Sequence, residues 1–210
     1  LFGCNDLKAL SADLKDPALE GTNDEGESLL YHALVQHLYD LHISKEQLYE
    51  YDQNIIRHTK EINVRRTEKI QWKYYQYLSL LFTEVFLDKY FADRKALLND
   101  INEFQENVFN FKPDTWHGVP PFEEDDLNKL AFWCATGSGK TLLMHVNIKQ
   151  YLHYAAKYRA PKLNRIIILT PNEGLSKQHL QELYLSDMQA ELFSKNSGRM
   201  FQGKTIDIID

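Results

Sequence analysis

The chain has 210 residues, 43% of them hydrophobic and 12% aromatic, which is enough apolar surface for a buried core. Glycine and proline supply only 9 and 6 residues, which excludes a collagen-like or disordered composition. Cys4 and Cys134 are too few for a disulfide framework, and every apolar run is too short to cross a bilayer. We therefore expect a cytoplasmic protein without a membrane partner. Because the first residue is Leu rather than Met, we also expect a piece of a longer protein.

The net charge of −6 is unevenly distributed along the chain. Residues 1–70 carry 8 basic and 13 acidic side chains, which gives −5, and residues 71–128 carry 5 and 11, which gives −6. Residues 129–210 carry 11 and 6, which gives +5. A basic third on an acidic chain indicates a polyanion site for a nucleotide or a nucleic acid.

The first 126 residues are expected to be mainly helical after an acidic, flexible segment over 1–27. Pro17, Gly21 and Gly26 interrupt residues 11–27, which is typical of a solvated connection. Apolar side chains then recur at helical spacing, and we expect them to form core. These positions are Leu30, Leu34, Leu38 and Leu41 behind the N-cap Ser28; Leu48, Tyr51, Ile55 and Ile62 behind the capping box Ser44–Gln47; Tyr74, Leu78, Leu81 and Val85; and Leu97, Ile101, Phe104 and Val108 behind the cap Asp93. The acids 123–126 suit the positive end of a short helix over 122–129 better than a cation site.

Residues 127–210 change to a strand–helix pattern. Short apolar runs at 130–134, 165–170 and 205–210 predict strands, and helical patterns span 140–158 and 173–193. The pattern over 140–158 has Leu142, Val146, Leu152 and Ala156 at helical spacing. This alternation predicts an α/β fold with a parallel sheet covered on both faces.

A phosphate-binding loop lies at the first strand-to-helix junction. Residues 135–141 read A-T-G-S-G-K-T. Gly137 and Gly139 permit a tight turn whose N–H groups, with those of Thr136 and Ser138, can surround phosphates. Lys140 can reach the β- and γ-phosphates of ATP, and the Thr141 hydroxyl can bind Mg²⁺. We assign Lys140 and Thr141 catalytic roles. Cys134 stands where the strict motif has Gly, and we expect it to fill space at the end of a buried strand.

A second motif follows the second expected strand. Residues 171–178 read P-N-E-G-L-S-K-Q, where Asn172 can cap the next helix and Gly174 allows a backbone to approach it. Free N–H groups there suit a nucleic-acid phosphate, with Pro171 and Gln178 beside them. An ordinary helix start is the alternative.

Together the two motifs resemble motifs I and Ia of superfamily 2 helicases and translocases, which are DEAD/DEAH-box-like. The motor subunits of type I and type III restriction enzymes are especially similar. Pro171, Leu175 and Gln178 match the family's P-T-R-E-L-A-x-Q, whereas Asn172, Glu173 and Gly174 replace its Thr-Arg-Glu. The resemblance implies a RecA-like motor domain over 127–210, preceded by the helical region 28–126.

Residues 72–76, W-K-Y-Y-Q, resemble the L-R-x-Y-Q element whose glutamine reads adenine in restriction-type motors. Gln76 would pair with adenine N7 and N6, because its amide both donates and accepts, and Tyr75 would stack. The alternative is a polar face on a core helix.

The family's Walker B acids, arginine fingers and second RecA-like domain are not evident, so we expect this chain alone to be inactive. Asp210 is a candidate Walker B residue, but we favour an intervening strand over 205–210. The resemblance implies an ATP-dependent DNA helicase or translocase of a restriction or phage-defence system, which acts on double-stranded DNA with a nuclease or methyltransferase subunit. The alternatives are a non-helicase P-loop ATPase or kinase, and a non-catalytic assembly module switched by ATP.

Overall fold

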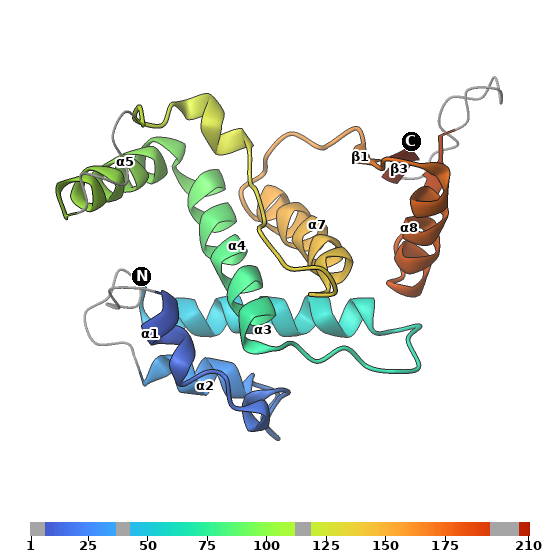
Figure 1. Cartoon of the computed structure of the whole chain (residues 1–210), viewed down its shortest axis with the longest axis horizontal. Helices are drawn as coiled ribbons and strands as arrows, with labels where there is room; N and C mark the ends of the chain where they lie inside the picture. The colour runs from blue at the N-terminus through green and yellow to red at the C-terminus, as the bar shows by residue number, and fades with distance from the viewer. Residues whose placement is uncertain (1–6, 37–42, 112–118, 194–205) are drawn as a thin grey trace.

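Helices followed by a small parallel sheet make up the computed structural model, which describes residues 7–36, 43–111, 119–193 and 206–210 (Figure 1). The helices are α1 (Leu7–Ala12), α2 (Leu29–Val35), α3 (Lys45–Ile62), α4 (Tyr74–Ala92), α5 (Arg94–Phe111), α7 (Lys140–Lys157) and α8 (Glu173–Leu185), with 3₁₀ turns η1 (Pro17–Leu19) and η2 (Glu124–Asn128). The strands are β1 (Ile166–Leu169), β2 (Ala190–Leu192) and β3 (Ile206–Ile209).

Side-chain caps fix the starts of several helices, as the sequence predicts. The Ser44 hydroxyl accepts from the Gln47 N–H at 3.1 Å, and the Gln47 side chain accepts from the Ser44 N–H at 3.0 Å. Ser28 caps α2 by accepting from the Leu30 N–H, and Asp93 caps α5. These bonds satisfy N–H groups that have no acceptor within a helix. Leu38 and Leu41 lie outside the described residues.

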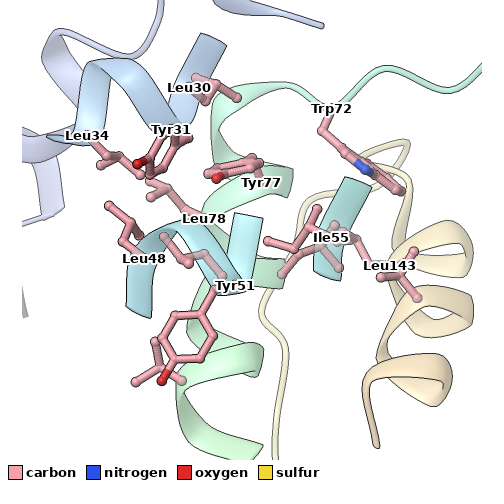
Figure 2. Packing of buried hydrophobic residues seen from close by; sticks show 14 of the residues in the cluster. Leu30, Tyr31, Leu34, Leu48, Tyr51, Ile55, Trp72, Tyr77, Leu78 and Leu143 are labelled. Atoms are coloured by element: carbon pink, nitrogen blue, oxygen red, sulfur yellow. The ribbon is translucent and has the colours of Figure 1, made fainter. Parts of the chain in front are cut away.

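The main core lies between α2, α3, α4 and α7, and we call it the helical core. Figure 2 shows its side chains converging from these helices, with Leu143 of α7 beside Ile55 of α3. Leu81 and Val146 are fully buried, as predicted. Because burial of such side chains drives folding, α7, which follows the glycine-rich loop, is held against the helical region by Leu143, Val146 and Tyr154.

Several predicted surface and core assignments are wrong. Leu10 and Leu14, 3% and 1% exposed, belong to the helical core, so the start of the N-terminal segment is packed rather than solvated. Phe104 is 68% exposed. The helix predicted over 140–158 is confirmed as α7, but its buried face carries Leu143, His145, Val146, Gln150 and Tyr154, and Leu152 and Ala156 from the predicted pattern are exposed. Helical spacing identified a helix there but not its buried side, because α7 is apolar on more than one face.

The sheet is parallel and has the strand order β1-β3-β2, which confirms an α/β class of the RecA-like type. Ile166 pairs with Ile206, and Ala190 pairs with Ile206 from the other side. We call these strands together with α8 the sheet region. Asp207 is 1% exposed on the central strand, and its carboxylate accepts from Arg165 at 2.7 Å. This ion pair explains how a charged residue fits within an apolar strand.

Two predicted elements differ in the structure. Residues 130–134 form no strand; Leu130, Phe132 and Cys134 instead line a cavity of about 700 Å³ together with Ile166 of β1. Trp133 is 96% exposed, and Cys134 is half-buried with a free thiol, not the filler of a buried strand. The helix predicted over 173–193 ends at Leu185, where Asp187 turns the chain with φ of 55°, and β2 follows.

No helix within the described ranges is both long and apolar enough to cross a membrane. The division of the chain into segments 1–27, 28–126 and 127–210 stays a prediction.

Candidate nucleotide-binding site

The glycine-rich loop over 135–139 turns directly into α7. Gly137 and Gly139 have φ of 76° and 84°, in the left-handed region that favours glycine. The Ser138 N–H closes the turn by donating to the Ala135 carbonyl at 3.2 Å. The N–H groups of Lys140 and Thr141, in the first turn of α7, have no acceptor within the helix. The loop therefore presents backbone donors at the positive end of a helix, which is an anion-binding arrangement.

Space and unsatisfied donors at this loop fit a phosphate group. A Cβ built on Gly137 would meet nothing within 4 Å, so the loop is open on that side. The Ser138 hydroxyl is buried and has no hydrogen-bond partner. A buried hydroxyl without a partner costs free energy, which a phosphate oxygen would recover by accepting its hydrogen bond. Thr141 is half-buried in the first helical turn, directly after Lys140.

The Lys140 ammonium group bends back over its own loop. Nζ donates to the carbonyls of Cys134 and Ala135 at 3.1 and 2.9 Å, and the residue is exposed. Neutral carbonyls are weaker partners for an ammonium group than phosphate oxygens are. A phosphate bound at this loop would therefore offer Lys140 stronger acceptors than these two carbonyls do.

Gln76 lies against the same loop, although 62 residues separate it from Ser138. Its Nε2 donates to the Ser138 carbonyl at 2.8 Å, and its Oε1 accepts from the Lys73 N–H at 2.9 Å. A Cβ on Gly139 would come within 2.6 Å of Nε2, so a side chain there would displace the Gln76 amide, and the φ of 84° also favours glycine. Tyr75 is 39% exposed beside it. Each end of the Gln76 amide thus has one partner within the protein, and adenine reading stays a prediction.

The second motif connects β1 to α8. Asn172 Oδ1 accepts from the Leu175 N–H at 3.0 Å, which confirms the predicted cap. Pro171, Gly174 and Gln178 are exposed at this helix start. Ser176 is 2% exposed, and its hydroxyl lies 2.6 Å from that of Thr170 at the end of β1. Sequence reasoning missed this bond, and the one signal for it is a serine where the related motif has alanine. The start of α8 thus has a fixed backbone and an open surface.

Comparison with known families gives one match. The family model described as type III restriction enzyme, res subunit, matches residues 45–208, which covers the helical core, the glycine-rich loop and the sheet. Searches of curated proteins and of solved structures find no match. The chain therefore belongs to the type III restriction enzyme res subunit family, whose helicase-like domain is of the superfamily 2 type.

Proposed function

We propose that the protein is a cytoplasmic ATP-dependent DNA helicase or translocase of a restriction or phage-defence system. The observation that carries the proposal is the loop over 135–139. It combines two left-handed glycines, an unpartnered buried Ser138 hydroxyl and the start of α7 in one open anion site. Membership in the restriction-enzyme family supports movement on DNA as the use of that site.

Different residues of the loop would bind different groups of ATP. The N–H groups of Thr136, Gly137, Ser138 and Gly139 would bind phosphate oxygens, and Lys140 would bind the β- and γ-phosphates. The Thr141 hydroxyl would hold Mg²⁺, which when bound neutralises phosphate charge. Positioned charges of this kind lower the barrier to phosphoryl transfer, because little of that barrier needs covalent chemistry from the protein.

The exposed N-terminal end of α8 would bind the nucleic acid. Pro171, Asn172, Gly174 and Gln178 surround N–H groups that can bind a strand phosphate. Contacts of this sort position a strand without reading its sequence, which suits a motor that moves along double-stranded DNA. A nuclease or methyltransferase subunit would then supply the base-specific and cleavage functions.

Nucleic-acid stimulation of ATP hydrolysis by the full-length protein separates this proposal from its alternatives. A DNA motor hydrolyses ATP faster when double-stranded DNA is added. A non-helicase ATPase or kinase turns over at the same rate with and without DNA, and an ATP-switched module binds ATP without turnover. The family match and the exposed start of α8 favour the first outcome. Hydrolysis unaffected by any DNA would contradict the proposal.

A further inference from the structure

The loop joining α3 to α4 contacts the far end of α8. Figure 1 shows this loop, residues 63–73, extending from the helical core toward α8. Arg66 Nη2 donates to the Glu182 carboxylate and to the Ser186 hydroxyl, both at 2.9 Å. The Arg66 side chain is only 12% exposed. An ion pair that is largely shielded from water and shares a further hydrogen bond holds its geometry better than an exposed pair does.

The neighbouring arginine makes a second set of contacts with the same helix end. Arg65 pairs with Asp187 at 2.6 Å and donates to the Tyr184 carbonyl at 3.2 Å. Its guanidinium lies 4.4 Å from the centre of the Tyr184 ring. The last carbonyls of a helix lack intrahelical donors and form its negative end, so two cations there are favourable. The loop therefore fixes the C-terminal end of α8.

A buried bond extends this contact to α7. The Ser186 hydroxyl lies 2.8 Å from His145 Nδ1, and both residues are 0% exposed. Burial, together with the charge of Arg66, lowers the pKa of His145 to about 3, so the imidazole is neutral. The Ser186 hydroxyl accepts from Arg66, and the tautomer of His145 sets which of the hydroxyl and Nδ1 donates in the second bond. Arg66, Ser186 and His145 thus form a continuous hydrogen-bonded chain, which we call the junction.

Each of the three elements that meet at the junction leads to a proposed site. The loop continues into α4, where Gln76 holds the phosphate-binding loop through Ser138. His145 lies in the second turn of α7, behind Lys140 and Thr141. Glu182 and Ser186 end α8, whose other end is the exposed second motif. A movement of α8 on binding a nucleic-acid strand would therefore change the position of Ser186, and through His145 the position of α7 at the nucleotide site.

We propose that Arg66 is a positioning residue that couples nucleic-acid binding at α8 to ATP hydrolysis at the loop over 135–141. It acts through Glu182, Ser186 and His145 and touches neither ligand. The inference rests on the proposed function, because it needs both sites to be in use. It predicts that removal of the arginine leaves both nucleic-acid binding and basal ATP hydrolysis in place but weakens the stimulation of hydrolysis by nucleic acid.

The test compares Arg66→Ala with wild type in the full-length protein, with ATP turnover measured across DNA concentrations. Basal turnover and KM for ATP should stay within about twofold. The DNA-stimulated increment in kcat should fall by roughly 5- to 150-fold, the range typical of coupling between two sites. Arg66→Lys should restore much of the DNA-stimulated increment. A single nitrogen, Nη2, contacts both Glu182 and Ser186, and an ammonium group can also donate to two acceptors. Lys89→Ala, which removes a cation from a surface pair with Asp100, should leave both activities unchanged.

A second variant keeps the inference testable if Arg66→Ala fails to fold. Ser186→Ala retains the ion pair with Glu182 but removes the link to His145, and it should lose stimulation in the same way. Unchanged stimulation in a folded Arg66→Ala or Ser186→Ala protein would overturn the inference and leave the proposed function intact. Equal loss of basal and stimulated turnover would overturn it too, since that is the result of a merely structural role. Wild-type protein without any DNA stimulation would instead contradict the proposed function, and the inference with it.

Discussion

The helical core and the sheet region are packed differently. The motif of the glycine-rich loop predicts that it follows a strand of the sheet, but the helix that it leads into, α7, packs in the helical core. The helical core buries large side chains completely, among them Tyr77, Tyr154 and Leu81. The sheet region has a small cluster of Ile168, Leu183, Ala190, Ile206 and Ile208. On β1, Ile167 and Leu169 are 56% and 77% exposed. The proposed nucleotide site therefore rests on packed helices, whereas the proposed nucleic-acid site rests on a thin sheet.

The largest expected difference between the two regions is in the free energy of unfolding. Leu81→Ala should lower it by about 3–5 kcal/mol, because it leaves a cavity among rigidly packed helices. Ile208→Ala should cost about 2–3 kcal/mol, because the small cluster around it can close over the gap more completely. Urea unfolding of both variants measures the difference. Equal costs would show that the two regions are packed alike.

Glu84 makes the stability of the helical core depend on pH. It is 0% exposed on α4 and accepts from Tyr154 and Asn54. Burial raises its pKa from 4.5 to about 7, against the effect of these hydrogen bonds. The folded state therefore keeps this proton when the unfolded state has lost it. Stability is fully present below pH 4.5, falls as pH rises toward 7 and is flat above, with a total loss on the order of 3 kcal/mol.

Glu84→Gln should remove this pH dependence, because the amide still accepts a hydrogen bond and never ionises. Urea unfolding at pH 5 and pH 8 checks this expectation. The free energy of unfolding of the variant should be larger than that of wild type at pH 8 and close to it at pH 5. Glu103→Gln, at an exposed site on α5, is the matched control and should follow wild type. A variant that kept the wild-type slope would mean that another group carries the titration.

Gln76→Ala tests whether the contact at the glycine-rich loop reads the base. If Gln76 pairs with adenine, ATP affinity should fall more than GTP affinity, by about 1–3 kcal/mol or roughly 5- to 100-fold. Nucleotide titrations of the variant measure this ratio, with Gln71→Ala, an exposed glutamine nearby, as the control. Equal weakening of both nucleotides would assign Gln76 to support of the Ser138 backbone alone.

The smallest expected effect is at the start of α8. Asn172→Ala should cost about 1 kcal/mol through the lost cap. Asn172→Asp keeps the capping oxygen and adds charge favourable to the helix but repulsive to a phosphate. It should therefore preserve thermal stability and weaken DNA stimulation of ATP hydrolysis. If Asn172→Asp left DNA stimulation untouched, this helix start would be only a cap.

Local signals in the sequence were sufficient to predict the helix caps, the turn of the glycine-rich loop and the strands at 166–169 and 206–209. Ser44 and Gln47 are three residues apart, so their pattern is visible without a fold. Residues 130–134 have the composition of a strand, but pairing depends on a neighbour and not on composition. β2 was hidden in a helical pattern, because its preceding turn depends on Asp187 at positive φ rather than on a glycine.

The contacts of the junction could not be predicted from the sequence at all. Arg66 and Glu182 are 116 residues apart, and an arginine in a polar loop is usually solvated. Nothing in the spacing of His145 and Ser186 indicates a buried bond. The Gln76 region was identified through its resemblance to a family element, but its contact with Ser138 needed the fold. Long-range polar contacts of this kind depend on packing that periodicity does not encode.

Hydrolysis of ATP by full-length Lys140→Ala protein tests the central claim most directly, namely that the loop over 135–141 is the ATPase site. Lys140 is exposed and its Nζ contacts only its own loop among the described residues, so the variant should keep the wild-type melting temperature. DNA-stimulated hydrolysis should fall by several orders of magnitude, because the lysine reaches the β- and γ-phosphates. Turnover retained at the wild-type rate in the folded variant would contradict the account and place the active site elsewhere.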